Sequence, residues 1–451
     1  MSQFINRIAE LYWNRRILII GLLGFSSGIP LFLTSSTLAQ WLCDEGISLT
    51  AIGFFGAATF PYSIKFLWAP LLDRMQLPFL TQYFGRRRGW LIVSHLLLMA
   101  GLIGFGMVDP ASNLTMVMTL ALIVNFAAAT QNVLMLAYQM ESLEKKMYGP
   151  GESIGITGYR IAMILSGAGA LYMETIISWN AVYLVMAALV GIGLVTVLLI
   201  PEPDPPHDLE SEKREAKICA HIEERYATSP RLAKTLSWLH TAAVAPFTDF
   251  MRRPGWVALI MLMVFYKLGD NILGTMPNLF YRDLGFSKVE IANASKLFGM
   301  CMSVLGGIIG GYVVTQYGFL RTILLGVILH GVANLMLVAM YYAGYDPFML
   351  YFSIGIEHIT SGFRTTALFA YQLTLCNTTY AATQLALLTS FVSFGRFAFT
   401  PFSGWLAEAL GWVDFFYLSF IAVFPGIFIL LYLMRVYGVS LWHNKISRQA
   451  A

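Results

Sequence analysis

Long apolar stretches separated by short polar intervals dominate this chain. A helix needs about 20 mainly apolar residues to cross the hydrocarbon core of a bilayer, which is about 30 Å thick. About twelve stretches of that length can be found with this criterion. They are 17–41, 50–72, 90–108, 114–140, 155–178 and 181–200 in the first half, and 255–281, 289–317, 320–343, 348–375, 382–409 and 413–437 in the second. The pattern predicts an all-α integral membrane protein with two sets of six spanning helices.

A long polar interval at 201–254 separates the two sets. It opens with PEPDPPHD, whose prolines are expected to end the preceding helix, and continues with ESEKREAK and HIEERY. Within 209–226, Glu mixes with Lys and Arg at helical spacing while apolar positions are few, which is typical of a surface helix. We therefore predict three parts, which are an N-terminal six-helix bundle (1–200), a linker with a surface helix (201–254), and a C-terminal six-helix bundle with a short tail (255–451).

The distribution of charge predicts how the chain is oriented. Lys and Arg stay on the cytoplasmic side in short loops. They occur before the first span, after the second and fourth, and in the linker, whereas the alternate loops carry acids such as Asp44, Glu45, Asp109 and Asp414. We expect both ends to be cytoplasmic. The apolar run after Arg16 is too long for a cleaved signal peptide, so the first span is expected to remain as an anchor.

Composition excludes several other classes of protein. Hydrophobic residues make up 57% of the chain and charged residues 12%, whereas a soluble domain carries about 25% charged residues. A soluble enzyme is therefore not expected. The formal charge of +4 is spread over short loops, so no nucleic-acid partner is expected. The four cysteines are scattered without CxxC or metal-ligand spacing, and no GxxxxGK[ST] string is present, so we expect no metal, no cofactor and no ATP-driven pump.

Corresponding loops of the two halves share a glycine and arginine pattern. Asp73-Arg74 follows the second span and precedes Gly85, Arg86, Arg87 and Arg88; the equivalent place after the eighth span reads Gly310-Gly311-Tyr312 and then Gly318-Phe319-Leu320-Arg321. Both resemble the cytoplasmic signature of the major facilitator superfamily, the second in eroded form. We interpret the motif as a conformational latch, in which the acid and the arginines pair across helix ends and helix dipoles in one state and separate in the other. In the alternative interpretation, the arginines only mark the cytoplasmic side.

Longer strings carry a more specific resemblance. GFSSGIPLFLTSSTLAQWL, FLWAPLLDR with FGRRRGW, YKLGD, LTLCNTTYAATQLALLTSFVSFGR and TPFSGWLAEALGW resemble the AmpG muropeptide permeases of that superfamily, in the same order over nearly the whole chain. The resemblance implies a two-bundle (6+6) fold in the bacterial inner membrane and import of anhydro-muropeptides by alternating access, coupled to protons. The expected partners are a small polar solute, protons and the bilayer, and we expect a monomer.

The fourth span departs from the family pattern. Where the family carries a string similar to QDxxxDAW, this chain reads Gln131-Asn132-Val133-Leu134-Met135-Leu136-Ala137-Tyr138. Asn132 keeps the shape of an aspartate but cannot titrate, and Leu136 offers neither charge nor hydrogen bonding. The departure leaves open an alternative cargo in the same scaffold, such as a siderophore, a nucleotide derivative or a small nutrient.

Ionisable residues within the spans are the candidate coupling groups, because each costs at least about 2.5 kcal/mol in hydrocarbon. Lys267 and Asp270 are three residues apart on one helical face, so they can pair or jointly line the passage. We predict that Asp270 couples transport to protons; the alternative is a static Lys267–Asp270 pair.

The tenth span adds Glu357, His358 and Arg364. Either Glu357 or His358 could carry the coupled proton. The alternative is a clamp between Glu357 and Arg364, which are seven residues apart on nearly one face. Lone His95 and His330 are expected to be hydrogen-bonded packing residues.

Cationic and amide side chains are the candidates for cargo binding. Lys65 lies deep in the second span, and Arg396 has no neighbouring acid in the sequence, so a buried guanidinium there would need an anion or carbonyl groups. Arg160, near the start of the fifth span, is expected to snorkel or to act in the latch, and the alternative is a contact with the cargo. Amides suit a sugar-peptide because its hydroxyl groups need hydrogen-bond partners. The predicted cargo contacts are Gln40, Lys65, Gln131, Asn132, Lys267, Asn271, Gln372 and Arg396.

Overall fold

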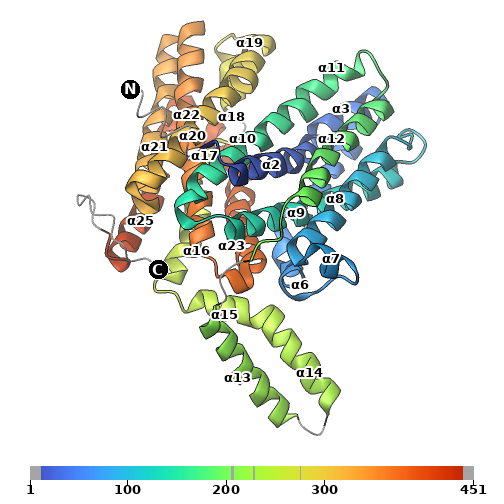
Figure 1. Ribbon diagram of the computed structural model, residues 1–451. Coiled ribbons are helices and arrows are strands. Elements are labelled where there is room, and N and C mark those ends of the chain that lie inside the picture. Colours follow the sequence, from blue (N-terminus) through green and yellow to red (C-terminus); the bar gives the residue numbers. More distant parts are fainter. Residues whose placement is uncertain (1–11, 205–207, 227–228, 275, 440–451) are drawn as a thin grey trace.

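The computed structural model describes residues 12–204, 208–226, 229–274 and 276–439, and their regular elements are all helical. The predicted cytoplasmic ends of the chain fall largely outside these ranges. Two groups of helices lie side by side, converging toward the face that carries α13 to α15 and separating at the opposite end (Figure 1). We call these two faces the linker side and the far side.

The first group is built from residues before the polar interval. Its α-helices are α2 (Arg15–Leu33), α3 (Ser36–Asp44), α4 (Leu49–Phe54), α5 (Pro61–Ile64), α6 (Ala69–Arg74), α7 (Leu80–Phe84), α8 (Arg86–Phe105), α9 (Leu114–Ser142), α10 (Tyr148–Ile164), α11 (Ala170–Glu174) and α12 (Trp179–Leu199). The fifth span begins earlier than the predicted residue 155, because Gly149, Pro150 and Gly151 form the first turn of α10 rather than a loop. Proline is compatible with a first turn, where its missing N–H would have no helical partner.

The second group follows the linker. Its α-helices are α16 (Trp256–Phe265), α17 (Leu268–Leu273), α18 (Met276–Asp283), α19 (Lys288–Ala292), α20 (Gly299–Tyr317), α21 (Phe319–Ala343), α22 (Pro347–Thr374), α23 (Ala381–Phe399), α24 (Ser403–Ile421) and α25 (Phe424–Val436). The eleventh span passes into the twelfth within α24 at Gly411, whose φ of 73° glycine adopts without steric cost.

Nine helical stretches among the described residues are long and apolar enough to cross a membrane. The other three predicted spans, the second, tenth and eleventh, are helical but more polar or interrupted. The second span is divided by two 3-10 turns, Phe55–Thr59 and Lys65–Leu67. The tenth and eleventh carry ionisable residues, as helices do when they line a polar path instead of facing lipid. The predicted fold class is confirmed.

The linker is more helical than the single surface helix predicted. The predicted helix is α13 (Leu209–Arg225), but α14 (Pro230–Leu239) and α15 (Ala245–Met251) follow it. The short, mixed stretch around α14 gave too weak a periodic signal to predict. In Figure 1, α13 and α14 project from the body as an antiparallel pair joined to the bundles through α15.

The hydrophobic clusters explain why the groups converge on the linker side. One cluster combines residues of both halves, including Ile20, Val133, Leu259, Leu385 and Leu430. A second contains only residues from the first half, and a third only residues from the second. Apolar burial therefore joins the two halves at one end, and each half packs separately at the other.

Candidate functional site

Asp270 lies on a short helix between two breaks in the seventh span. Lys267 leaves the helical conformation (φ −106°, ψ 20°), so α17 starts anew at Leu268, and Gly274 (φ 52°) ends it. Breaks of this kind expose backbone groups within a span, which is tolerated where the chain lines a cavity or contacts other protein groups. Here Arg364 occupies the first break, because its Nη1 donates to the carbonyl oxygen of Tyr266 at 3.2 Å.

Asp270 is the centre of a charged cluster contributed by three spans. One carboxylate oxygen forms an ion pair with Nη2 of Arg364 on α22. The other lies 2.6 Å from Nε2 of His330 on α21, whose Nδ1 lies 2.9 Å from the Thr360 hydroxyl. The side chains of Arg364 and His330 are 1% and 2% exposed, whereas that of Asp270 is 31% exposed. The carboxylate is thus held from behind by buried groups while it stays accessible from the other side.

These contacts differ from the pairs considered from the sequence. Asp270 does not pair with Lys267, because the break at Lys267 removes the helical geometry that would place the two side chains together. Arg364 pairs with Asp270 and not with Glu357. His330, expected only to pack, is a direct partner of Asp270, and sequence spacing held no signal for a contact sixty residues away.

Glu357 and His358 form a second, looser pair on α22. Nε2 of His358 lies 3.6 Å from a carboxylate oxygen of Glu357, and both side chains are partly exposed. Glu357 also interacts electrostatically with His330, so the pair adjoins the Asp270 cluster. The structure therefore places all three predicted coupling residues in one region.

Polar residues of the first half form separate contacts. Nζ of Lys65, a residue 4% exposed in its 3-10 turn, donates to Oδ1 of Asn132 at 3.0 Å. Leu136, one turn further along α9, is buried in the shared apolar cluster. Gln131 donates to the Ser26 hydroxyl and also contacts His95 Nε2 at 2.8 Å, so this amide joins packed helices.

The remaining predicted cargo residues are not all together. Gln40 lies in the middle of α3 and donates to Asp44 at the end of that helix. Gln372 is 1% exposed, and its Nε2 contacts the sulfur of Met263 at 3.0 Å. Asn271 is also buried, next to Asp270, with no hydrogen-bond partner for its Nδ2 among the described residues. Arg396 is exposed, which corrects the expectation of a buried guanidinium.

Asp73 connects the halves on the linker side. Its carboxylate, on a residue 1% exposed, accepts hydrogen bonds from the backbone N–H groups of Ala382 (3.0 Å) and Thr383 (2.8 Å), and from the Thr383 hydroxyl (2.7 Å). Those amides lie in the first turn of α23, in the other half. A carboxylate at a helix N-terminus satisfies free N–H groups and opposes the positive end of the helix dipole.

The arginines predicted with Asp73 surround it. Arg87 pairs with Asp73 at 2.8 Å and with Glu141 at 2.6 Å, and all three side chains are 1% exposed. Arg86 donates to the Asp73 carbonyl at 2.5 Å, and Arg88 donates to two carbonyl groups at the end of α12. Gly85 has a φ of 86°, and a Cβ there would clash with the carboxyl group of Glu202, which accepts from the first N–H groups of α8.

The second half repeats the backbone of this motif without its acid. Gly318 before α21 has φ 83° and ψ 169°, close to the 86° and 174° of Gly85 before α8. In place of a charged contact, Gly149 of α10 and Gly311 of α20 meet directly; a Cβ on Gly149 would lie 2.7 Å from the Gly311 carbonyl oxygen. Arg321, the predicted arginine of this second motif, also has an interaction partner.

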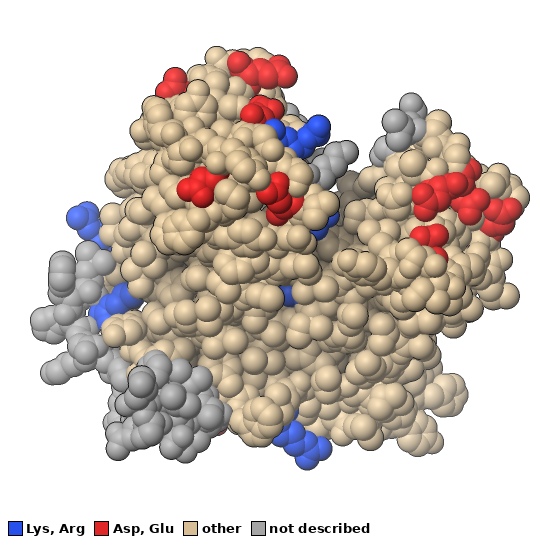
Figure 2. All heavy atoms as spheres, turned by 90° about the horizontal axis from the view of Figure 1, so that it is seen from above, with Lys and Arg blue, Asp and Glu red and all other residues tan. Residues whose placement is uncertain are grey.

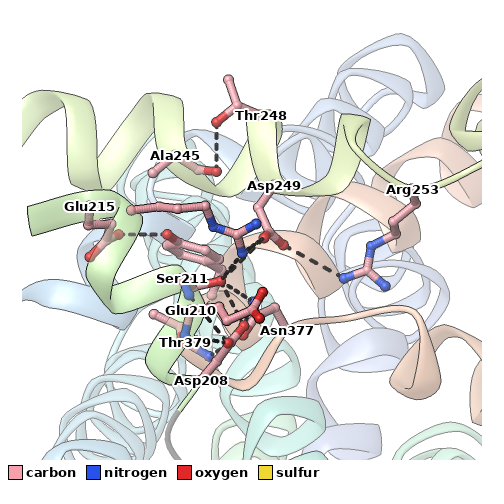
Figure 3. A network of polar contacts seen from close by, with 12 residues as sticks. Asp208, Glu210, Ser211, Glu215, Ala245, Thr248, Asp249, Arg253, Asn377 and Thr379 are labelled. Atoms are coloured by element: carbon pink, nitrogen blue, oxygen red, sulfur yellow. Dashed lines mark hydrogen bonds and ion pairs between the residues drawn. The ribbon is translucent and has the colours of Figure 1, made fainter. Parts of the chain in front are cut away.

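The linker adds a third set of contacts on the same side (Figure 3). Asp208 caps α13 and accepts from Nδ2 of Asn377 at 2.7 Å, in the second half. Glu215 of α13 pairs with Arg74 of α6 and accepts from the Tyr380 hydroxyl at 2.7 Å. Asp249 of α15 lies 3.7 Å from Arg253. It also accepts a hydrogen bond from Gln384 at 3.0 Å. The helix α13 therefore contacts both halves.

Comparison with known proteins identifies the family. Residues 21–277 match the family described as Major Facilitator Superfamily. The anhydromuropeptide permease of Escherichia coli K12 is 33% identical over 424 residues, which are 94% of this chain and 80% of that protein. A putative transporter AmpG 2 of Rickettsia typhi is 31% identical over 93% of this chain and 96% of its own length, and a putative transporter AmpG 4 of Rickettsia felis is 31% identical over 96% and 100%.

Solved structures resemble the fold. The proton:xylose symporter XylE bound to 6-bromo-6-deoxy-D-glucose matches with a TM-score of 0.66 over 95% of this chain and 96% of that one, at 13% identity. A double tryptophan variant of XylE matches with a TM-score of 0.67 at 12% identity, over 94% and 95% of the two chains. At this identity the likeness concerns the arrangement of the helices.

Proposed function

The chain belongs to the major facilitator superfamily and, within it, to the AmpG-type permeases, so it is a membrane transport protein and not an enzyme; from this premise we propose that it imports anhydro-muropeptides into the cytoplasm, driven by protons. The proposed cargo is that of the related anhydromuropeptide permease, and the proposed mechanism rests on the contacts between the two halves and around Asp270. The linker side is the cytoplasmic side, and the far side faces the periplasm of a bacterial inner membrane. Two bundles, 1–200 and 255–451, move against each other around a central passage.

The contacts on the linker side support alternating access. Three sets of contacts join the halves at one end. They are the hydrogen bonds of Asp73 to the start of α23, the close approach of Gly149 and Gly311, and the contacts of α13. Each is short and directional, so all would break together when the halves rock and the passage opens to the cytoplasm. The present arrangement then corresponds to the state that receives cargo from outside, and Asp73 with its arginines is the latch of that state.

Asp270 carries the proposal of proton coupling. Its carboxylate is partly exposed on one side and bound by Arg364 and His330 on the other. Protonation would remove the negative charge that holds the Arg364 guanidinium, and would free this cation to change partners. Glu357 and His358, on the same helix as Arg364, are next in reach to receive the proton.

The test uses purified protein in proteoliposomes with labelled anhydro-muropeptide. An inward proton gradient should drive accumulation, a protonophore should abolish it, and Asp270→Asn should lose accumulation while keeping exchange of labelled for unlabelled cargo. Asp283→Asn is the matched control, because Asp283 ends the same broken span, is exposed, and among the described residues has a side-chain hydrogen bond only with Trp412. Gradient-driven accumulation that persists in Asp270→Asn would contradict coupling at this residue.

A second cargo class is motivated by the fourth span. Asn132 neutralises one position of the family string, and buried Leu136 removes the other. A siderophore, a nucleotide derivative or a small nutrient would fit the same scaffold. The same proteoliposomes, supplied from outside with each of these solutes in parallel, decide between the cargoes. Accumulation of one of these solutes without uptake of muropeptide would replace the proposed cargo and leave the transport mechanism in place.

A further inference from the structure

Three cationic side chains of the two halves lie within electrostatic reach across the boundary between the halves. Arg160 belongs to α10, Lys267 to the break in the seventh span, and Arg396 to α23. The ammonium group of Lys267 is repelled by Arg364, and also by Arg160 and Arg396. Tyr159, beside Arg160, interacts electrostatically with Arg396. Because α10 belongs to the first half and the other two residues to the second, the cluster spans the boundary between them.

None of these three cations has an ion-pair partner among the residues that the structure describes. Lys267 has only the ring of Phe369, 5.7 Å from its Nζ. The nearby acids are already engaged, Asp270 with Arg364 and His330, and Glu357 with His358. Counting Arg364, four cations face two carboxylates, which leaves two positive charges uncompensated.

Arg396 is exposed to solvent, but the excess of positive charge around Lys267 needs a reason. Charged residues within spans are costly, and in structural roles they pair with each other or with backbone carbonyl groups. Snorkelling along lipid does not account for Arg160, because it interacts with Lys267 and His358 of the other half, toward the inside of the molecule. These interactions favour the alternative for Arg160, a contact with the cargo.

Two further observations point to a ligand. Nδ2 of Asn271 is a buried donor without a partner, and it lies 3.3 Å from the position of a Cβ on Gly395, the residue before Arg396. Viewed from the far side, the surface is hollowed between the two groups of helices, and separate Lys or Arg atoms are visible in that hollow, while Asp and Glu lie on the outer parts (Figure 2). The unpaired Asn271 donor thus lies where the span that carries Lys267 meets the span that carries Arg396.

We propose that Arg160, Lys267 and Arg396 form an anion site that binds two carboxylates of one solute, a specificity that rests on the proposed import function. Each guanidinium can hold a carboxylate with two parallel hydrogen bonds, and the Lys267 ammonium adds a point charge. The bound carboxylates cancel the repulsion between cations of opposite halves. Cargo therefore binds more tightly as the halves close around it, and this difference in affinity favours closure.

Binding to the purified full-length protein tests the site. Calorimetry compares anhydro-muropeptide bearing free carboxylates with the same molecule after amidation of all its carboxylates. The amidated form should bind at least about tenfold more weakly, and Arg160→Gln and Arg396→Gln should each weaken the free form about 10- to 100-fold, the range for one charge-assisted hydrogen bond. Arg396→Lys should recover part of the loss. Arg435→Gln is the control, since Arg435 is an exposed arginine at the end of α25, away from the cluster.

A second probe separates this inference from the proposed cargo. A glutamate-containing tripeptide with two free carboxylates is compared with its diamide in the same titrations. If muropeptide is not transported but the tripeptide binds and loses affinity in Arg396→Gln, the anion site stands and the cargo proposal fails. If muropeptide is transported while amidated and free probes bind equally, and Arg396→Gln binds as the native protein does, the anion site is refuted.

Discussion

Replacing Asp73 by Asn should open the linker side of the molecule. The carboxylate accepts three hydrogen bonds from Ala382 and Thr383 across the boundary between the halves. Asn retains one acceptor oxygen and loses the charge, so at least one charge-assisted bond and the favourable interaction with the α23 dipole disappear. A loss of about 1.5–3 kcal/mol follows, which shifts the equilibrium toward the linker-side-open state about 10- to 100-fold.

Cys376 provides the assay. It lies buried in the loop between α22 and α23, close enough to Tyr148 of the first half to interact electrostatically with it. Burial raises the pKa of the Cys376 thiol to about 12, so both access and the thiolate fraction are low while the halves are closed. With Cys43, Cys219 and Cys301 replaced by Ser, the rate of maleimide labelling reports the open population, provided that opening and closing are faster than labelling.

We expect the labelling rate of Cys376 to rise about 10- to 100-fold in Asp73→Asn, in proportion to the open population. Asp109→Asn is the matched control, because Asp109 is an exposed acid in the loop between α8 and α9 on the far side. Thermal unfolding of both variants shows whether the fold is intact. An unchanged labelling rate in a well-folded Asp73→Asn protein would refute the latch.

Three further predictions concern the same side of the molecule. Arg87→Leu leaves Asp73 and Glu141 buried without their shared cation, so the free energy of unfolding should fall by about 3–5 kcal/mol; a melting temperature equal to that of the native protein would contradict this. Gly149→Ala should speed Cys376 labelling, because its Cβ would meet the Gly311 carbonyl in the other half. Gly306→Ala should instead lower the melting temperature, because its Cβ would meet the Ile359 carbonyl within the same half. Faster labelling in Gly306→Ala and a lower melting temperature in Gly149→Ala would refute the packing argument. Asp208→Ala removes the cap of α13 at a cost of about 1 kcal/mol and should speed cleavage of 201–254 by an acid-active protease. Burial tends to raise the pKa of Asp208, but hydrogen bonds from Ser211 and Asn377 outweigh it and hold the pKa below its ordinary value. The stabilisation by this carboxylate is therefore complete above the unfolded pKa of about 3.9 and is lost as the pH falls further. Equal cleavage of native and variant protein at pH 6 would contradict the docking of α13.

Local patterns were enough to predict much of this protein. The order and approximate bounds of the spans follow from hydropathy, which acts on each segment separately: the predicted spans 289–317 and 320–343 differ little from the helices that end at Tyr317 and Ala343. The glycine motif was also readable, because the positive φ of Gly85 and Gly318 is a property of the local backbone.

Only the tertiary structure decided which charges meet. Asp270 pairs with Arg364 and His330 because packing of three spans brings them together, while the break at Lys267 removes the nearer candidate from its helical face. The same packing engages Asp73 with the start of α23, and it brings Arg160 and Arg396 within electrostatic reach of Lys267. Periodicity gives the face of a helix on which a residue lies, but a charge acts through space, and its partner depends on how the helices break, tilt and pack.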